Sequence, residues 1–205
     1  KITGNKVGEG YGAGVYVGGG TFDMYGGSIS GNNQLGWNYN GDGGGVYISS
    51  GSFNLHDGTI TGNNGYWGGG VNLYSGAFNM EGGKISNNTA GRNGTGGGVY
   101  VYNGTFTMTG GEISGNHVTN GKGGAIYIKS GGVVNIFGGT IKDNHVYSGN
   151  GGAIYVEAGG TLNLYGGTIT GNTASGLGGG IYAEAGGRVN IQGAPAVTGN
   201  TAGGK

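Results

Sequence analysis

Apolar and polar residues alternate in three short segments that recur along the chain about every 28 residues. The first segment is typified by residues 15–17 (Val-Tyr-Val) and the second by residues 22–24 (Phe-Asp-Met). Alternation with a period of two predicts a strand with one buried face. The third segment is centred on the apolar residue of an Ile-x-x-Asn frame, and glycines interrupt any helical pattern. The pattern therefore predicts three short strands in each repeat.

The Ile-x-x-Asn frame sets the period of the repeat, with steps of 27, 31, 25, 28, 28, 28 and 28 residues. Such self-similarity is typical of a solenoid, in which each unit buries its apolar face against its neighbours. We expect an all-β, right-handed parallel β-helix of about seven coils of ~27–28 residues, with the hand set by the crossover rule. Residues 1–205 are expected to form this single domain, and the interrupted terminal repeats predict an excerpt of a longer solenoid. The frames begin at Ile2, Ile29, Ile60, Ile85, Ile113, Ile141, Ile169 and Val197.

Glycine and asparagine have structural roles in the predicted coil. Glycine pairs such as Gly26-Gly27 and Gly166-Gly167 suit tight turns, which require a positive φ. The Asn of each frame ends the third strand at a corner, where side-chain amides of successive coils can hydrogen-bond to one another. The sequence therefore predicts an asparagine ladder along the rod.

Composition narrows the possible functions. Glycine supplies 60 of the 205 residues without the three-residue period of collagen. Charged residues make up 9% and cancel to a net charge of zero, so we expect no nucleic-acid partner. The absence of cysteine excludes disulfides and thiolate metal sites. No segment has the ~20 apolar residues of a membrane span, so we expect no membrane insertion by this chain.

The repeat also resembles those of known surface proteins. Gly-Gly-Ala-Ile at 123–126 and 151–154, combined with the hydrophobic-x-x-Asn frame, resembles repeats of polymorphic outer-membrane-protein and autotransporter-type adhesins. It is more similar still to the GGTITGNTA…GGGIY repeats of large surface proteins of Gram-positive gut bacteria, although Ile or Val replaces the Phe of the outer-membrane family. The resemblance implies a β-helix exported to the bacterial cell surface, often for adhesion.

One column of tyrosines is expected on the outer face of the first strand. Successive rings would lie roughly 4.8 Å apart, which suggests an aromatic strip that contacts a glycan or a host surface protein. The alternative is that tyrosine suits a strand surface and stabilises it through contacts between neighbours. The column consists of Tyr16, Tyr47, Asn72, Tyr100, Tyr127, Tyr155 and Tyr182.

Two loops carry both tryptophans of the chain. Residues 33–42 contribute Trp37 and Tyr39, and the next loop contributes Tyr66 and Trp67. Aromatic side chains on loops over a rigid scaffold predict a recognition patch. The alternative is that these rings fold back over the turns.

Catalytic and metal sites are weakly supported. Glu157 and Glu184 occupy equivalent positions on adjacent coils, as a glycosidase pair would require, but Lys129 occupies the same column one coil earlier. His117 and His145 stack on neighbouring coils without the third ligand that a metal needs. We therefore expect neither an enzyme nor a cofactor.

Two further alternatives concern the outer face and the ends of the rod. Thr-x-Thr at 59–61 and 168–170 resembles ice-binding β-helices, but Lys84, Glu112 and Lys142 interrupt the hydroxyl array. Exposed strand edges at the ends favour end-to-end self-association, so a purely structural spacer or a fibre subunit is the alternative to an adhesin.

Overall fold

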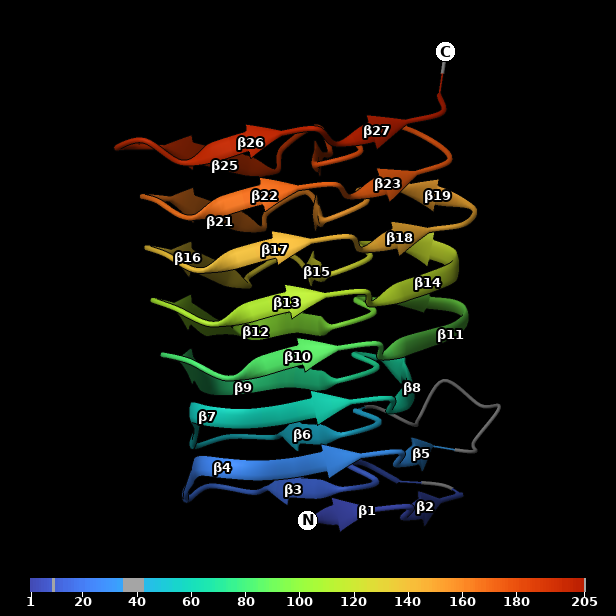
Figure 1. The fold of residues 1–205 in the computed structure, drawn as a ribbon, viewed down its shortest axis with the longest axis vertical. Coiled ribbons are helices and arrows are strands. Elements are labelled where there is room, and N and C mark those ends of the chain that lie inside the picture. Colours follow the sequence, from blue (N-terminus) through green and yellow to red (C-terminus); the bar gives the residue numbers. More distant parts are fainter. Residues whose placement is uncertain (9, 35–42, 205) are drawn as a thin grey trace.

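The computed structural model describes residues 1–8, 10–34 and 43–204, which form a parallel β-solenoid of about 7 turns with ~28 residues per turn. The coils stack along the long axis of the molecule, and the two termini lie at opposite ends of the rod (Figure 1). The predicted β-helix is thus confirmed as a parallel solenoid. No helix in the described residues is long and apolar enough to cross a membrane.

The three predicted segments form one parallel sheet of 18 strands. Register is maintained from coil to coil: Val99 pairs with Ile126, and Phe106 pairs with Val134. In some coils two segments run together into one ten-residue strand. The strands are β1 (Ile2–Thr3), β3 (Val15–Val17), β4 (Thr21–Ser30), β6 (Val46–Ile48), β7 (Ser52–Thr61), β9 (Val71–Met80), β10 (Lys84–Ser86), β12 (Val99–Met108), β13 (Glu112–Ser114), β15 (Ile126–Ile128), β16 (Val133–Ile136), β17 (Thr140–Lys142), β20 (Ile154–Val156), β21 (Thr161–Leu164), β22 (Thr168–Thr170), β24 (Ile181–Ala183), β25 (Arg188–Ile191) and β26 (Ala196–Thr198).

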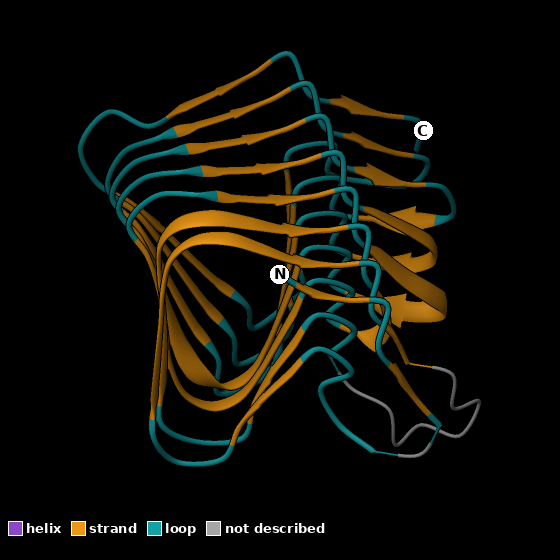
Figure 2. Cartoon of the chain, turned by 60° about the horizontal axis from the view of Figure 1, so that its bottom comes forward, coloured by secondary structure: helices purple, strands orange, loops and turns teal. Residues whose placement is uncertain are grey.

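A second parallel sheet of nine short strands follows the asparagine corners, and the sequence analysis did not predict it. It forms a flange along one side of the solenoid (Figure 2). Its own small core consists of Ala90, Val118, Val146 and Ala174, one residue from each of four coils. The strands are β2 (Lys6–Val7), β5 (Asn33–Gln34), β8 (Asn64–Trp67), β11 (Thr89–Thr95), β14 (His117–Lys122), β18 (His145–Val146), β19 (Gly149–Asn150), β23 (Thr173–Ala174) and β27 (Thr201–Ala202).

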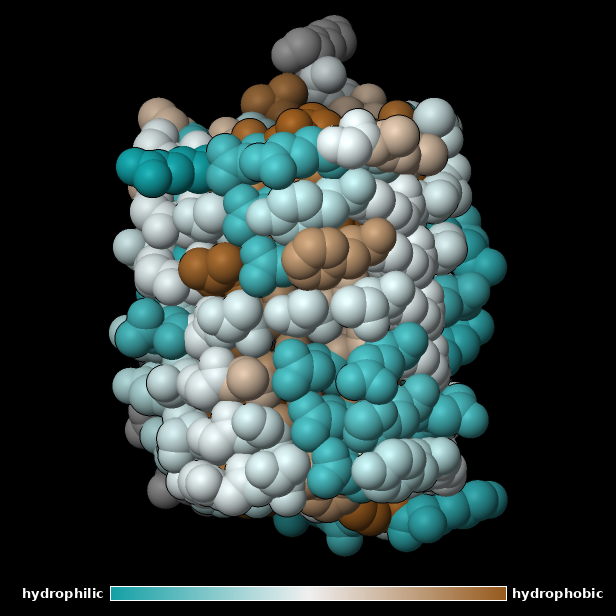
Figure 3. Space-filling model, turned by 90° about the vertical axis from the view of Figure 1, so that its left-hand side faces the viewer, coloured by the Kyte–Doolittle hydropathy of each residue, from teal (hydrophilic) through white to brown (hydrophobic). Residues whose placement is uncertain are grey.

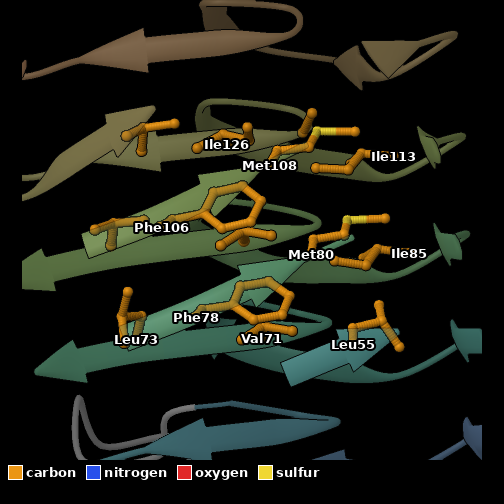
Figure 4. Packing of buried hydrophobic residues seen from close by; sticks show 14 of the residues in the cluster. Leu55, Val71, Leu73, Phe78, Met80, Ile85, Phe106, Met108, Ile113 and Ile126 are labelled. Atoms are coloured by element: carbon orange, nitrogen blue, oxygen red, sulfur yellow. The ribbon is translucent and has the colours of Figure 1, made fainter. Parts of the chain in front are cut away.

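The main core is one continuous column of apolar side chains inside the coils. Phe78 packs against Phe53 edge-on at 5.5 Å and stacks on Phe106 at 4.7 Å between ring centroids. All three phenylalanines are fully buried. Methionine and isoleucine side chains of successive coils, such as Met80 and Ile85, line up beside the rings (Figure 4). Burial of such a column at about 25 cal/mol per Å² of apolar surface stabilises the rod.

The predicted asparagine ladder is present from Asn5 to Asn200. Asn88 Nδ2 donates to Asn116 Oδ1 at 2.9 Å, and Asn116 Nδ2 donates to Asn144 Oδ1 at 3.0 Å. The same Asn116 Oδ1 also accepts from the Asn88 backbone N–H at 3.0 Å, and Asn116 Nδ2 donates to the Ile85 carbonyl oxygen at 3.0 Å. Each interior amide therefore satisfies buried polar groups of three coils, which is the condition for burying it.

The glycine-rich turns are required by the close approach of the coils. Gly167, at φ 82°, adopts the left-handed conformation that the sequence predicted for the glycine pairs. Glycine is required at position 124 for a different reason, because a Cβ there would lie 2.2 Å from the Gly152 carbonyl oxygen of the next coil. Both requirements keep side chains out of the corners and let neighbouring coils pair.

Candidate functional site

The tyrosine column forms as the sequence predicts. Tyr100, Tyr127, Tyr155 and Tyr182 pair in register on successive coils. Their ring centroids are 5.4, 5.3 and 5.0 Å apart, and the ring planes differ by 4°, 9° and 27°. Each interior ring therefore has both faces against its neighbours and turns only its edge outward.

The expectation that this column is an exposed strip is wrong for most of its members. Tyr47, Tyr100 and Tyr127 are no more than 5% exposed and Tyr155 is 1% exposed, whereas Tyr16 in the first coil is 54% exposed. The flange accounts for part of this burial: Lys122 of β14 places its Nζ 4.6 Å from the Tyr155 ring centroid. The expected three strands per coil did not include this sheet, whose Lys122 and Trp67 pack against the rings of Tyr155 and Tyr100.

Trp67 fills the position where the tyrosine column has Asn72. Its ring stacks on Tyr100 at 5.9 Å between centroids, and Tyr66 packs against it edge-on at 5.2 Å. Asn72 is 1% exposed and donates its Nδ2 proton to the Trp67 carbonyl oxygen at 3.2 Å. The half-buried Trp67 thus folds back over the strand, which is the alternative that the sequence analysis left open. Trp37 and Tyr39 lie outside the described residues, so their part in a recognition patch stays a prediction.

Both glutamates of the row formed by Lys129, Glu157 and Glu184 take part in ion pairs. Lys129 Nζ lies 3.5 Å from Glu157 Oε2, and Lys122 Nζ lies 3.0 Å from Glu184 Oε1. The Tyr155 hydroxyl also donates to Glu184, and this hydrogen bond, more than the lysine, lowers the pKa of that carboxyl group. Burial raises the pKa of the Tyr155 hydroxyl in turn. Both carboxylates therefore have cationic partners.

The two stacked histidines hydrogen-bond to threonines of adjacent coils. His117 Nε2 lies 3.0 Å from Thr89 Oγ1, and His145 Nδ1 contacts Thr173 Oγ1. Burial and the neighbouring His145 lower the pKa of His117. Among the described residues, no group of three or more His, Cys, Asp or Glu side chains is arranged to hold a metal ion.

A column of exposed and half-buried side chains, which the sequence did not reveal, lies at the corner after the second strand. Tyr25 is 73% exposed and stacks on His56 at 4.4 Å, while Phe137 is 51% exposed and stacks on Tyr165 at 4.5 Å. On the side of the molecule where these corners lie, hydrophobic residues are scattered among polar ones (Figure 3). The residue type changes from coil to coil, so no repeat pattern marks the column. It consists of Tyr25, His56, Glu81, Thr109, Phe137, Tyr165 and Gln192.

His56 links three coils electrostatically at this corner. Its Nδ1 lies 2.8 Å from Glu81 Oε2, and its Nε2 lies 3.5 Å from Asp23 Oδ1. The hydrogen bond with Glu81 and the two negative charges raise the pKa of His56 above its ordinary value of 6.5. The imidazolium form therefore stabilises the folded state.

Replacing His56 with glutamine is expected to lower the melting temperature more at low pH than at high pH. Because the folded pKa is raised, this stabilisation is fully present below about pH 6.5, the unfolded value, and is lost as the pH rises through the folded value. Melting temperatures of the wild type and His56→Gln should differ at about pH 5.5 and converge near pH 9. Glu81→Gln should show the same convergence. A difference in melting temperature that does not change with pH would show that the protonated form of His56 is not the source of the stabilisation.

Comparison with known proteins does not assign the chain to a family. No family model matches it. Neither the curated proteins nor the solved structures give a match. The class that the structure supports is a β-solenoid of parallel sheets, and any role at a bacterial surface is a matter for proposal.

Proposed function

We propose that this chain is a non-catalytic, extracellular stalk segment of a bacterial surface protein. The observation that carries the proposal is the continuity of the rod: the asparagine ladder and the phenylalanine stack tie each coil to the next. Such a rod resists bending, because each coil pairs its backbone with both neighbours. The burial of most of the tyrosine column also favours a stabilising role for these rings over a binding role. The resemblance to adhesin repeats supports the extracellular location.

The stalk role predicts a single, fixed length. Because the chain contains no cysteine, spin labels can be attached at Thr3→Cys and Thr198→Cys without competition. Both positions are exposed and occupy equivalent places seven coils apart, so we expect one narrow distance of about 34 Å by pulsed electron resonance. A broad distribution would contradict a rigid stalk.

A second candidate function is contact with a glycan or host protein through the aromatic patch around Trp67. The supporting observation is that Tyr74, 44% exposed, stacks on Tyr102 at 4.8 Å on the coils next to Trp67. Tryptophan fluorescence against a panel of polysaccharides and mucin-type glycans tests this role, with Trp37→Phe and Trp67→Phe separating the two signals. A saturable shift supports the patch, and a flat response across the panel favours the stalk alone.

A further inference from the structure

The fourth coil interrupts two outward columns of side chains at the same level. Strand β12 places Thr107 in the column of polar residues on the outer face of the second segment. Two residues later, Thr109 occupies the exposed corner column. In both columns the neighbouring coils carry larger side chains, so the two short threonines leave a depression in the surface.

The first interrupted column is a second amide ladder. Asn79 Nδ2 donates to Asn54 Oδ1 at 2.8 Å, and Asn163 Nδ2 donates to Asn135 Oδ1 at 2.8 Å. Thr107 pairs with Asn79 on one side and Asn135 on the other but has too short a side chain to bridge them. Because every amide in this ladder donates toward the N-terminal end of the rod, Asn79 presents its Oδ1 to the gap. Asn135 presents its Nδ2 from the other side.

The second interrupted column contributes an aromatic ring. Tyr165 covers one face of Phe137, with the two ring planes 7° apart. Thr109 lies on the other side, where no ring stacks on Phe137 among the described residues. Phe137 is 51% exposed and lies outside the main core, so its ring remains partly open to solvent.

An open depression of about 400 Å³ lies between the third and fourth coils, and Asn135 and Phe137 of the fifth coil flank Thr107 and Thr109 on its C-terminal side. Its size falls within the range of small-molecule sites, roughly 300–1,000 Å³. The lining offers amide, hydroxyl and carboxylate groups, and the one carboxylate, Glu81, already hydrogen-bonds to His56. The lining residues are Asn79, Met80, Glu81, Thr107 and Thr109.

We propose that this depression, the coil-four notch, binds one sugar ring of a neutral glycan. A pyranose has an apolar C–H face and a rim of hydroxyls, each of which can donate and accept. In the depression its hydroxyls suit the acceptor of Asn79 and the threonine hydroxyls. Toward the fifth coil its apolar face suits the partly exposed ring of Phe137, and a further hydroxyl suits the donor of Asn135. Anionic glycans fit less well, because Glu81 lies in the lining. The site stands on the geometry of the fourth coil and does not depend on the stalk role.

Filling the notch provides the sharpest test. Thr107→Asn would complete the amide ladder from Asn79 to Asn135 and fill the space that the sugar ring would occupy. We expect the melting temperature to stay the same or rise, while affinity for a neutral oligosaccharide falls at least about tenfold. Phe137→Ala should weaken binding to a similar extent by removing the platform. Matched controls are Thr21→Asn and Tyr25→Ala, exposed substitutions of the same kinds in the first coil, which should bind as the wild type does.

The measurement is calorimetric titration with neutral oligosaccharides of glucose, galactose and N-acetylglucosamine, alongside sialylated and uronic-acid oligosaccharides. Binding of a neutral compound that both notch variants lose and both controls keep supports the proposal. Absence of binding up to about 1 mM overturns it, as does binding that Thr107→Asn leaves unchanged. Preference for the anionic compounds would also overturn it. None of these results bears on the spin-label distance, so the proposed glycan site and the proposed stalk role can be refuted independently.

Discussion

Replacing Asn116 with alanine is expected to lower the free energy of unfolding by about 4 kcal/mol. The substitution removes the acceptor of two buried donors, the backbone N–H and the Nδ2 of Asn88. It also removes the donor to the Ile85 carbonyl oxygen, deep in the same corner. Each buried group left without a partner costs about 1–3 kcal/mol, and no water can reach this fully buried position.

Urea denaturation followed by circular dichroism measures this loss. The matched control is Asn120→Ala, which removes an exposed amide that donates to Asn93 Oδ1 at 2.7 Å on the flange. An exposed hydrogen bond contributes little, so the control should lose less than about 1 kcal/mol. Equal losses for the two variants would mean that the ladder has no special role in stability.

Replacing Phe78 with alanine is expected to cost a similar amount, about 4 kcal/mol, for a different reason. Phe78 is fully buried between Phe53 and Phe106, so its removal leaves a cavity that the stacked coils cannot collapse to fill. The backbone of each coil is fixed by pairing on both sides, which limits relaxation. The aromatic contacts with both neighbours are lost as well.

The same denaturation experiment tests this expectation. Phe78→Leu retains most of the buried volume and should recover more than half of the loss. Phe137→Ala removes a ring that is 51% exposed and should cost less than about 1 kcal/mol. A loss for Phe78→Ala as small as that of Phe137→Ala would show that the core relaxes around the missing ring.

The main solenoid could be predicted from the sequence because its constraints repeat in every coil. The Ile of each frame from Ile29 to Ile169 is buried, the following Asn forms the ladder, and the glycines supply the turns. Phe78 and Val101 face inward at the places where the two-residue alternation puts them. Each of these positions is fixed by a local requirement of shape or hydrogen bonding, so the residue type itself records it.

The flange could not be predicted in the same way. Its strands β18 and β23 have two residues each, and two residues show no alternation. Its core side chains are small, such as Ala90 and Ala174. Because this sheet was not predicted, the tyrosine column was expected to be more exposed than it is. Part of the cover over Tyr155 comes from Lys122 of β14.

The coil-four notch escaped the sequence analysis for the opposite reason. A repeat analysis searches for what successive coils share, whereas the notch exists because Thr107 and Thr109 differ from their counterparts. Only the paired register shows that both short residues fall at one level and that Phe137 lies beside them. In a repetitive scaffold, candidate sites are therefore best sought at coils where two adjacent columns of side chains both depart from their usual residue type.

The asparagine ladder also bears on how rods of this kind change length. Every amide from Asn5 to Asn172 donates toward the C-terminal end, so Asn88 meets Asn116 in the same way that Asn116 meets Asn144. If one whole coil were removed, Asn88 would meet Asn144 and remake the same bonds. As far as the ladder is concerned, such a rod can therefore gain or lose complete coils, with each coil changing its length by about 4.8 Å.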